Sequence, residues 1–313
     1  MADKKAFSLN LQKLGPFIGL LVITIILAVM SPNFLTLNNI LNVLRQVSIN
    51  ALIAFGMTFV ILTGGIDLSV GAILALSGAL TAGLMTNGMD PILAILVGLL
   101  VGAVMGMVNG LLVAKGKVAP FIATLATMTI FRGLTLVYTE GRPITGFDSD
   151  MFTMLGAGYL FIIPVPIIWT LGCFAVLYFI LKKTAFGRRV YAIGGNEEAA
   201  ILSGIKVSRV KIYIYALTGF LSALAGIILT SRLNSAQANA GMGYELDAIA
   251  AVVLGGTSLS GGRGWIFGTL IGAMIIGVLN NGLNLLEVSS FYQQVVKGSV
   301  ILLAVLLDRK KAT

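Results

Sequence analysis

The sequence contains no histidine and only one cysteine, and these absences exclude several kinds of site. Without histidine the chain cannot form a HExxH zinc site, a Ser-His-Asp triad or a Cys-His catalytic pair. Cys173 lies in an apolar run and has no second cysteine with which to form a disulfide. We therefore interpret Cys173 as a small buried hydrophobic residue, and we expect neither catalytic residues nor a metal site.

Charged residues are also scarce. They make up 11% of the 313 residues, against roughly 25% in soluble domains, whereas hydrophobic residues make up 58%. The mean hydropathy of +1.00 indicates a protein whose main solvent is lipid. Because a helix needs ~20 apolar residues to cross the hydrocarbon, residues 1–313 have room for about ten spans in a single transmembrane domain.

Apolar runs bounded by Pro, Gly, Asn or charged residues predict the membrane-spanning helices. The first run follows several lysines and has no cleavage pattern at its end, so we interpret it as a retained anchor. The expected fold is an all-α polytopic bundle. The ten runs lie at 15–30, 39–63, 70–86, 91–114, 120–138, 165–181, 211–230, 245–258, 265–283 and 290–307.

The basic residues predict the orientation of this bundle. If the ten spans alternate in direction, 16 of the 21 Lys and Arg residues fall on one side. The positive-inside rule assigns that side, with both termini, to the cytoplasm. The net charge of +9 is thus a topology signal in a chain surrounded by membrane lipid, and we expect no nucleic-acid partner.

Glycine patterns predict two further features of the bundle. Residues 64–69 and 255–260 share the form GGxxLS, which indicates a two-halved pseudo-repeat with broken helices near a transport path. Coincidence in a chain with 38 glycines is the alternative interpretation. The repeat of glycine every fourth residue along one span predicts close packing of another helix; these residues are Gly98, Gly102, Gly106 and Gly110.

The predicted cytoplasmic loop 182–211 contains a short, well-capped helix. Asn196 can cap its start, Glu197 and Glu198 suit the positive end of its dipole, and Gly204 stops it. Two turns of helix are too short to be stable alone in water, so this helix should dock. It packs either on the chain's own cytoplasmic surface or in a groove on a partner, which would receive Ala199, Ala200, Ile201 and Leu202.

Three segments together carry a resemblance to a known family. They are GGIDLSVG at 64–71, the loop 186–204 and LGGTSLSGGRG at 254–264. The chain resembles the ribose-type sugar permeases of ABC transporters, and the likeness covers almost its whole length, including PFIATL at 120–125. The resemblance implies a permease homodimer in the bacterial inner membrane and an extracytoplasmic sugar-binding protein. It also implies an ATPase subunit engaged through the loop that begins with Phe186, Gly187 and Arg188.

ATP hydrolysis is expected on that separate subunit. The sequence has no GxxxxGK(S/T) motif, and its nearest candidate, Gly116-Lys117, has Leu111 in place of the first glycine and Val118 after the lysine. We therefore expect this chain to be a transporter subunit and not an enzyme. It should hold no cofactor itself, with ATP and Mg bound by the ATPase.

Four polar residues within or between the spans are candidates for the substrate path. Asp67 lies between two apolar runs, where it either caps the following helix or contacts sugar. Arg132 lies twelve residues into its span and either lines the path or extends towards the outer surface. Asn50 and Asn280 are expected to line the path, because amide groups match sugar hydroxyls, although hydrogen bonding between helices is the alternative.

Other functions remain open at this point. Related permeases carry nucleosides, branched-chain amino acids or a signalling furanone through the same architecture. An ion-coupled secondary transporter would need buried acids, for which Asp67 is the one good candidate. A structural membrane protein without transport activity would have little use for broken helices or for Arg132.

The outer segments 140–159 and 233–247 are where we expect the sugar-binding protein to bind when it delivers its sugar.

Overall fold

The computed structural model describes the backbone of residues 2–147 and 149–312, and the side chains of 14–147, 149–303 and 306. Thirteen helices and one antiparallel two-stranded hairpin form the described chain. They are α1 (Ala2–Met30), α2 (Leu37–Leu62), α3 (Val70–Thr86), α4 (Pro91–Ala114), α5 (Pro120–Thr139), α6 (Asp150–Gly156), β1 (Tyr159–Leu160), β2 (Ile163–Pro164), α7 (Val165–Lys183), α8 (Ala185–Gly195), α9 (Glu197–Leu202), α10 (Val207–Leu233), α11 (Tyr244–Leu254), α12 (Ile266–Leu285) and α13 (Ser290–Ala312).

Each of the ten predicted apolar runs coincides with a helix, which confirms an all-α membrane fold. Six helices of the described residues, α2, α4, α5, α7, α10 and α12, are long and apolar enough to cross a membrane by length and composition, and Leu14–Met30 and Val70–Thr86 form two shorter apolar helices. The run at 245–258 forms only the 11-residue helix α11. At 1.5 Å per residue α11 is about 16 Å long, roughly half the thickness of the hydrocarbon.

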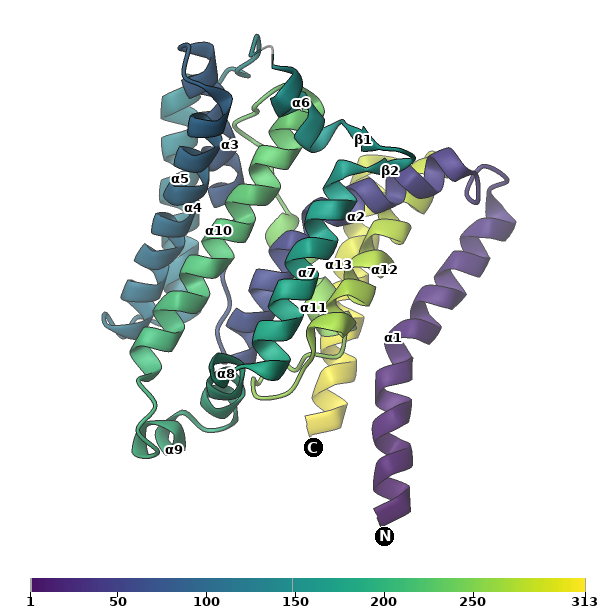
Figure 1. Cartoon of the computed structure of the whole chain (residues 1–313). Helices are drawn as coiled ribbons and strands as arrows, with labels where there is room; N and C mark the ends of the chain where they lie inside the picture. Colours follow the sequence, from purple (N-terminus) through teal and green to yellow (C-terminus); the bar gives the residue numbers. More distant parts are fainter. Residues whose placement is uncertain (1, 148, 313) are drawn as a thin grey trace.

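The two ends of the bundle differ in what they carry (Figure 1). Both chain ends lie at the end that carries α8 and α9, which we call the α9 end. The short helix α6 and the β1–β2 hairpin lie at the opposite end, the hairpin end. The termini and the 182–211 loop therefore share one side, as predicted from the charges, and the assignment of that side to the cytoplasm stays a prediction.

The centre of the bundle is built on α10, which packs closely along α4. The predicted glycine face of α4 provides the contact. A Cβ at Gly110 would lie 2.7 Å from the Cα of Ile212, and one at Gly102 would collide with the Cβ of Ala223. Because the glycines of this face have no side chains, the backbones of α4 and α10 approach each other directly. The close packing predicted from the sequence is therefore confirmed.

Two non-helical segments interrupt the bundle, 63–69 between α2 and α3 and 234–243 between α10 and α11. The first contains the predicted GGxxLS break. Like the first, the second GGxxLS, at 255–260, lies in a non-helical segment between two helices, α11 and α12, and their interpretation as broken helices stays a prediction. Its neighbour Gly262 donates a backbone hydrogen bond to the Leu62 carbonyl at 3.0 Å, so the two similar segments lie together.

Candidate functional site

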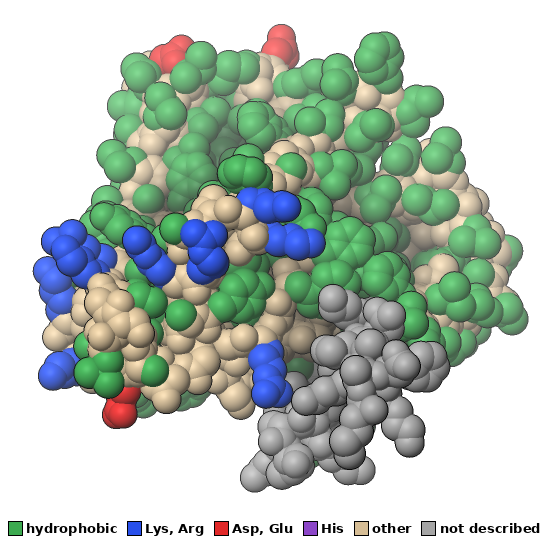
Figure 2. All heavy atoms as spheres, turned by 60° about the horizontal axis from the view of Figure 1, so that its bottom comes forward, with side chains coloured by type: hydrophobic (Ala, Val, Ile, Leu, Met, Phe, Trp, Pro, Cys, Tyr) green, Lys and Arg blue, Asp and Glu red, His purple; other side chains and the backbone are tan. Residues whose placement is uncertain are grey.

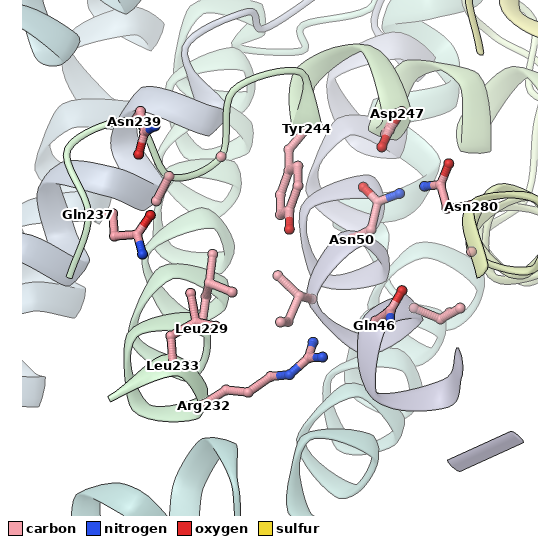
Figure 3. A pocket seen from close by; sticks show the side chains of 15 residues that line it. Gln46, Asn50, Leu229, Arg232, Leu233, Gln237, Asn239, Tyr244, Asp247 and Asn280 are labelled. Atoms are coloured by element: carbon pink, nitrogen blue, oxygen red, sulfur yellow. The ribbon is translucent and has the colours of Figure 1, made fainter. Parts of the chain in front are cut away.

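A polar cavity of about 450 Å³ opens between α2, α10, α11, α12 and the loop 234–243 (Figure 3). Its residues on α2 come from the middle of that helix, and those on α10 come from the last turns, which lie at the hairpin end. Cavities of this size are typical of small-molecule sites. The lining residues are Gln46, Val47, Ile49, Asn50, Leu229, Arg232, Leu233, Gln237, Asn239, Ala240, Gly241, Tyr244, Asp247, Gly277 and Asn280.

Asn50 and Asn280 both line this cavity, so the structure brings together two of the four predicted path residues. The Oδ1 atoms of both side chains are buried and accept no hydrogen bond from the described residues. A buried acceptor without a donor costs free energy, which a hydroxyl of a bound ligand would recover. Their arrangement is suited to a polar, uncharged ligand.

Most of the other polar lining residues were not predicted. Gln46 lies one helical turn before Asn50, on the same face of α2, so helical periodicity could have identified it. Tyr244 begins α11 and points into the cavity, and Arg232 extends across it from α10 (Figure 3). No sequence signal shows that the loop 234–243, with Gln237 and Asn239, folds towards the cavity.

Asp247, on the first turn of α11, is held by a cation on another helix. The Nζ of Lys297 on α13 lies 3.1 Å from Oδ2 of Asp247, whose side chain is 8% exposed. Asp247 belongs to the segment 233–247, where we expect a delivering protein to bind, but its side chain is buried within the bundle. Lys297 therefore compensates the negative charge of the Asp247 carboxylate that lines the cavity.

Arg132 does not line the cavity. Its Nη1 donates hydrogen bonds to the carbonyl oxygens of Ala238 at 2.7 Å and Ala240 at 2.8 Å. The side chain is half-buried, and its guanidinium is bound to the loop 234–243. Because Ala240 is a lining residue, Arg132 contacts the cavity only through the loop that it holds.

Asp67 is fully buried and also lies outside the cavity lining. Its Oδ1 accepts hydrogen bonds from the backbone N of Ser69 at 2.9 Å and from Ser69 Oγ at 2.7 Å. Asn109 Nδ2 on α4 donates to the same hydroxyl at 2.7 Å. Asp67 thus closes the turn immediately before α3, which is closer to the local, capping interpretation than to contact with sugar.

The predicted short helix is present as α9. The Asn196 side chain caps it by accepting a hydrogen bond from the Ala199 N at 2.9 Å, and Gly204 follows it with φ of +80°. Glu197 in its first turn forms a salt bridge of 2.7 Å with Lys211 at the start of α10. The capping signals therefore located this helix to within two residues at each end.

The face that α9 offers to a partner is narrower than expected. Leu202 is 88% exposed and Ile201 is 55% exposed, and Ala199 is exposed as well. Ala200 instead is buried against the chain itself. One side of α9 therefore packs on its own chain and the other is free among the described residues, so docking into a groove on a partner stays a prediction.

The preceding helix α8 was not predicted, and it connects α9 to the bundle. The pKa of the Tyr191 hydroxyl on α8 is raised by burial, so it stays protonated and donates to the Gly264 carbonyl at 2.9 Å. A Cβ at Gly194 would collide with the Leu62 carbonyl oxygen and would lie close to Gly262. The end of α8 thus touches the backbone at both GGxxLS segments.

Comparison with known proteins decides what kind of molecule this is. A family described as the branched-chain amino acid transport system permease component matches residues 39–305. The chain belongs to this family of transport permeases. As a permease component it is a transporter subunit, not an enzyme.

Several curated relatives of this permease are similar over nearly its full length. The ribose import permease protein RbsC of Bacillus subtilis is 72% identical over 303 residues, 96% of this chain and 94% of the relative. RbsC of Escherichia coli K12 is 55% identical, with 94% and 92% covered. The D-allose permease AlsC of Escherichia coli K12 is 46% identical, with 98% and 95% covered. No solved structure matches the chain.

Proposed function

We propose that this chain is the membrane-spanning permease subunit of an ATP-driven ribose importer in the bacterial inner membrane. The observation that carries the proposal is its high identity, over nearly the whole chain, with ribose import permeases of three organisms. Several neutral amide side chains of the cavity, which lie beside Arg232 and the ion-paired Asp247, agree with a sugar substrate. The family name alone would also allow a branched-chain amino acid, but no pair of opposite charges for its ammonium and carboxylate is free in the cavity, since Lys297 compensates Asp247.

Ribose would pass between α2, α10, α11 and α12 in the proposed mechanism. Asn50 and Asn280 would accept hydrogen bonds from sugar hydroxyls through amide oxygens that have no other donor among the described residues. Gln46, Gln237 and Asn239 would supply further donors and acceptors. The permease should bind sugar weakly, because a tight site in the path would slow its release.

ATP binding and hydrolysis on a separate subunit would drive the change from outward-open to inward-open. Ile201 and Leu202 would insert into a groove of that ATPase, and α8 would carry the movement to the bundle. The proposed assembly has two copies of this permease and an extracytoplasmic ribose-binding protein at the hairpin end. Residues 1–313 would form one transmembrane domain of about ten spans, with both termini in the cytoplasm.

The test is reconstitution of the permease with its copurified ATPase in liposomes. Ribose-loaded binding protein should stimulate ATP hydrolysis and ribose uptake, whereas D-allose and L-arabinose, the substrates named for less similar relatives, should not. Stimulation by one of those sugars alone would assign a different substrate to the same machine. An ion gradient that drives uptake without any ATPase would contradict the proposal.

A further inference from the structure

A second cavity, of about 540 Å³, lies at the α9 end of the molecule and does not belong to the transport path. It is enclosed by the start of α8, the linker after α9 and the first turns of α10. None of its lining residues lines the polar cavity described above. The lining residues are Phe186, Arg189, Ser203, Gly204, Ile205, Lys206, Arg209, Val210 and Tyr213.

The charge of this cavity is of one sign. Arg189, Lys206 and Arg209 line it, and no acidic residue does. The salt bridges within the described side chains join Lys211 to Glu197 and Lys297 to Asp247, so the three cations are not neutralised there. A concave site with three cations and no acid concentrates positive potential and attracts an anion.

One side of the same cavity, formed by the first turns of α8 and α10, is largely apolar. Val210 and Tyr213 belong to the first turns of α10, and Phe186 to the first turn of α8. Tyr213 is 60% exposed, whereas the next two residues, Ile214 and Tyr215, are buried in the core. Tyr213 therefore faces away from the bundle interior, as aromatic side chains at a membrane interface do.

We propose that this cavity binds the phosphate-bearing headgroup of an anionic phospholipid. Arg189, Lys206 and Arg209 would bind the phosphate, and the first acyl carbons would lie against Tyr213 and Phe186. Basic pockets between membrane helices on the cytoplasmic side recognise anionic headgroups in this way. Assignment to the cytoplasmic leaflet rests on the proposed orientation, but binding itself requires neither ribose nor ATPase.

A lipid suits the cavity better than a carboxylate of the ATPase. The exposed tip of α9, Ile201 and Leu202, is the proposed ATPase contact, and neither residue lines the cavity, which shares only Phe186, Arg189, Ser203 and Gly204 with the loop 186–204. Figure 2 shows Lys and Arg side chains gathered over this end of the molecule beside apolar surface. A ligand with both a charged head and an apolar tail matches that combination.

The experiment measures lipid binding by the purified full-length chain. The chain is titrated with phosphatidylglycerol or phosphatidylcholine, and bound lipids are counted by native mass spectrometry. The combined variant Arg189→Gln, Lys206→Gln, Arg209→Gln should lower the preference for phosphatidylglycerol by at least roughly tenfold. The control Lys115→Gln, Lys117→Gln, Lys183→Gln removes the same charge from the same end and should change the preference less than about twofold.

Additional variants and ligands separate a headgroup site from its alternatives. Arg189→Lys with Arg209→Lys keeps the charge and should keep lipid binding, which shows that a loss in the Gln variant is not misfolding. An equal loss in the charge-matched control would overturn the proposal in favour of general surface charge. Displacement of phosphatidylglycerol by millimolar inorganic phosphate would overturn it in favour of a free-anion site. A Gln variant that keeps its lipid but no longer copurifies with the ATPase would assign the cavity to that partner.

Discussion

Arg132 on α5 donates a hydrogen bond of 2.8 Å to the carbonyl of Ala240, 108 residues further along the chain. The same guanidinium nitrogen holds Ala238, so one cation fixes two carbonyls of the loop that closes one side of the polar cavity. A charged donor is well suited to this role, because hydrogen bonds to charged groups are roughly twice as strong as neutral ones. Arg132 is therefore a positioning residue for the cavity.

Arg132→Leu removes both hydrogen bonds and should loosen the loop 234–243. We expect ribose uptake in proteoliposomes to fall by at least about tenfold, since each hydrogen bond to a charged group contributes ~1.5–3 kcal/mol. Arg132→Lys should retain part of the uptake, because one ammonium can still reach a carbonyl. Full uptake by the Leu variant, with normal yield and stability, would show that the loop keeps its position without Arg132.

Asn50→Ala and Asn280→Ala should each raise the ribose concentration needed for half-maximal uptake, and the double variant should raise it further. Each change removes an acceptor for a sugar hydroxyl, a difference of ~1 kcal/mol or about fivefold. Asn284→Ala is the matched control, because Asn284 accepts from Gln293 outside the cavity and is exposed. Equal effects of all three substitutions would exclude a specific role for the cavity amides.

Leu202→Asp should uncouple the permease from its ATPase. The side chain is almost fully exposed on α9, so a charge there is tolerated by the fold but not by an apolar groove on a partner. We expect normal membrane insertion and a loss of both copurified ATPase and uptake. Glu197→Ala should have a smaller effect through loss of the Lys211 salt bridge, which is partly exposed and thus contributes little.

Ser203→Ala is the control for this surface, because Ser203 directly follows α9 and, among the described residues, its hydroxyl donates only to the Ala199 carbonyl within the same turn. Its uptake should match the unmodified chain. If Leu202→Asp also transports normally, the ATPase contacts a different surface.

Substitutions of Asp67 should separate a local role from a role in the path. Asp67→Asn keeps an Oδ1 acceptor for Ser69 and should leave thermal stability and uptake close to normal. Asp67→Ala leaves the buried Ser69 donors unpaired and should destabilise the protein by ~1–3 kcal/mol, measured as a lower unfolding temperature. A stable Asn variant that no longer transports would instead require the carboxylate charge for function.

The sequence predicted helices well because lipid imposes a simple rule. Any backbone group in hydrocarbon must be satisfied within its own helix, so apolar length alone located the ten runs. The helix α9 was predicted for a different reason, since Asn196 and Gly204 are local capping signals. The helix α8 also has a capping residue at its start, Thr184, but its glycine-rich end resembles a loop, and the helix was not predicted.

The cavity was predictable only where its residues lie on regular helices. Asn50 and Asn280 are polar residues inside apolar runs, which marks them without knowledge of the fold. Gln237 and Asn239 line the cavity because the loop 234–243 folds into the bundle, and that path depends on Arg132 far away in sequence. Tertiary hydrogen bonds of this kind leave no periodic pattern in the amino-acid order.

The contact of α8 with Leu62 and Gly262 has a mechanical consequence. Because Gly194 and Gly262 have no side chains, the backbone of α8 directly contacts the backbone at Leu62 and Gly262. A side chain at such a contact could absorb a push by changing rotamer, whereas a peptide group is nearly incompressible. A displacement of α9 by the proposed ATPase would therefore be passed directly to the end of α2 and to the loop between α11 and α12.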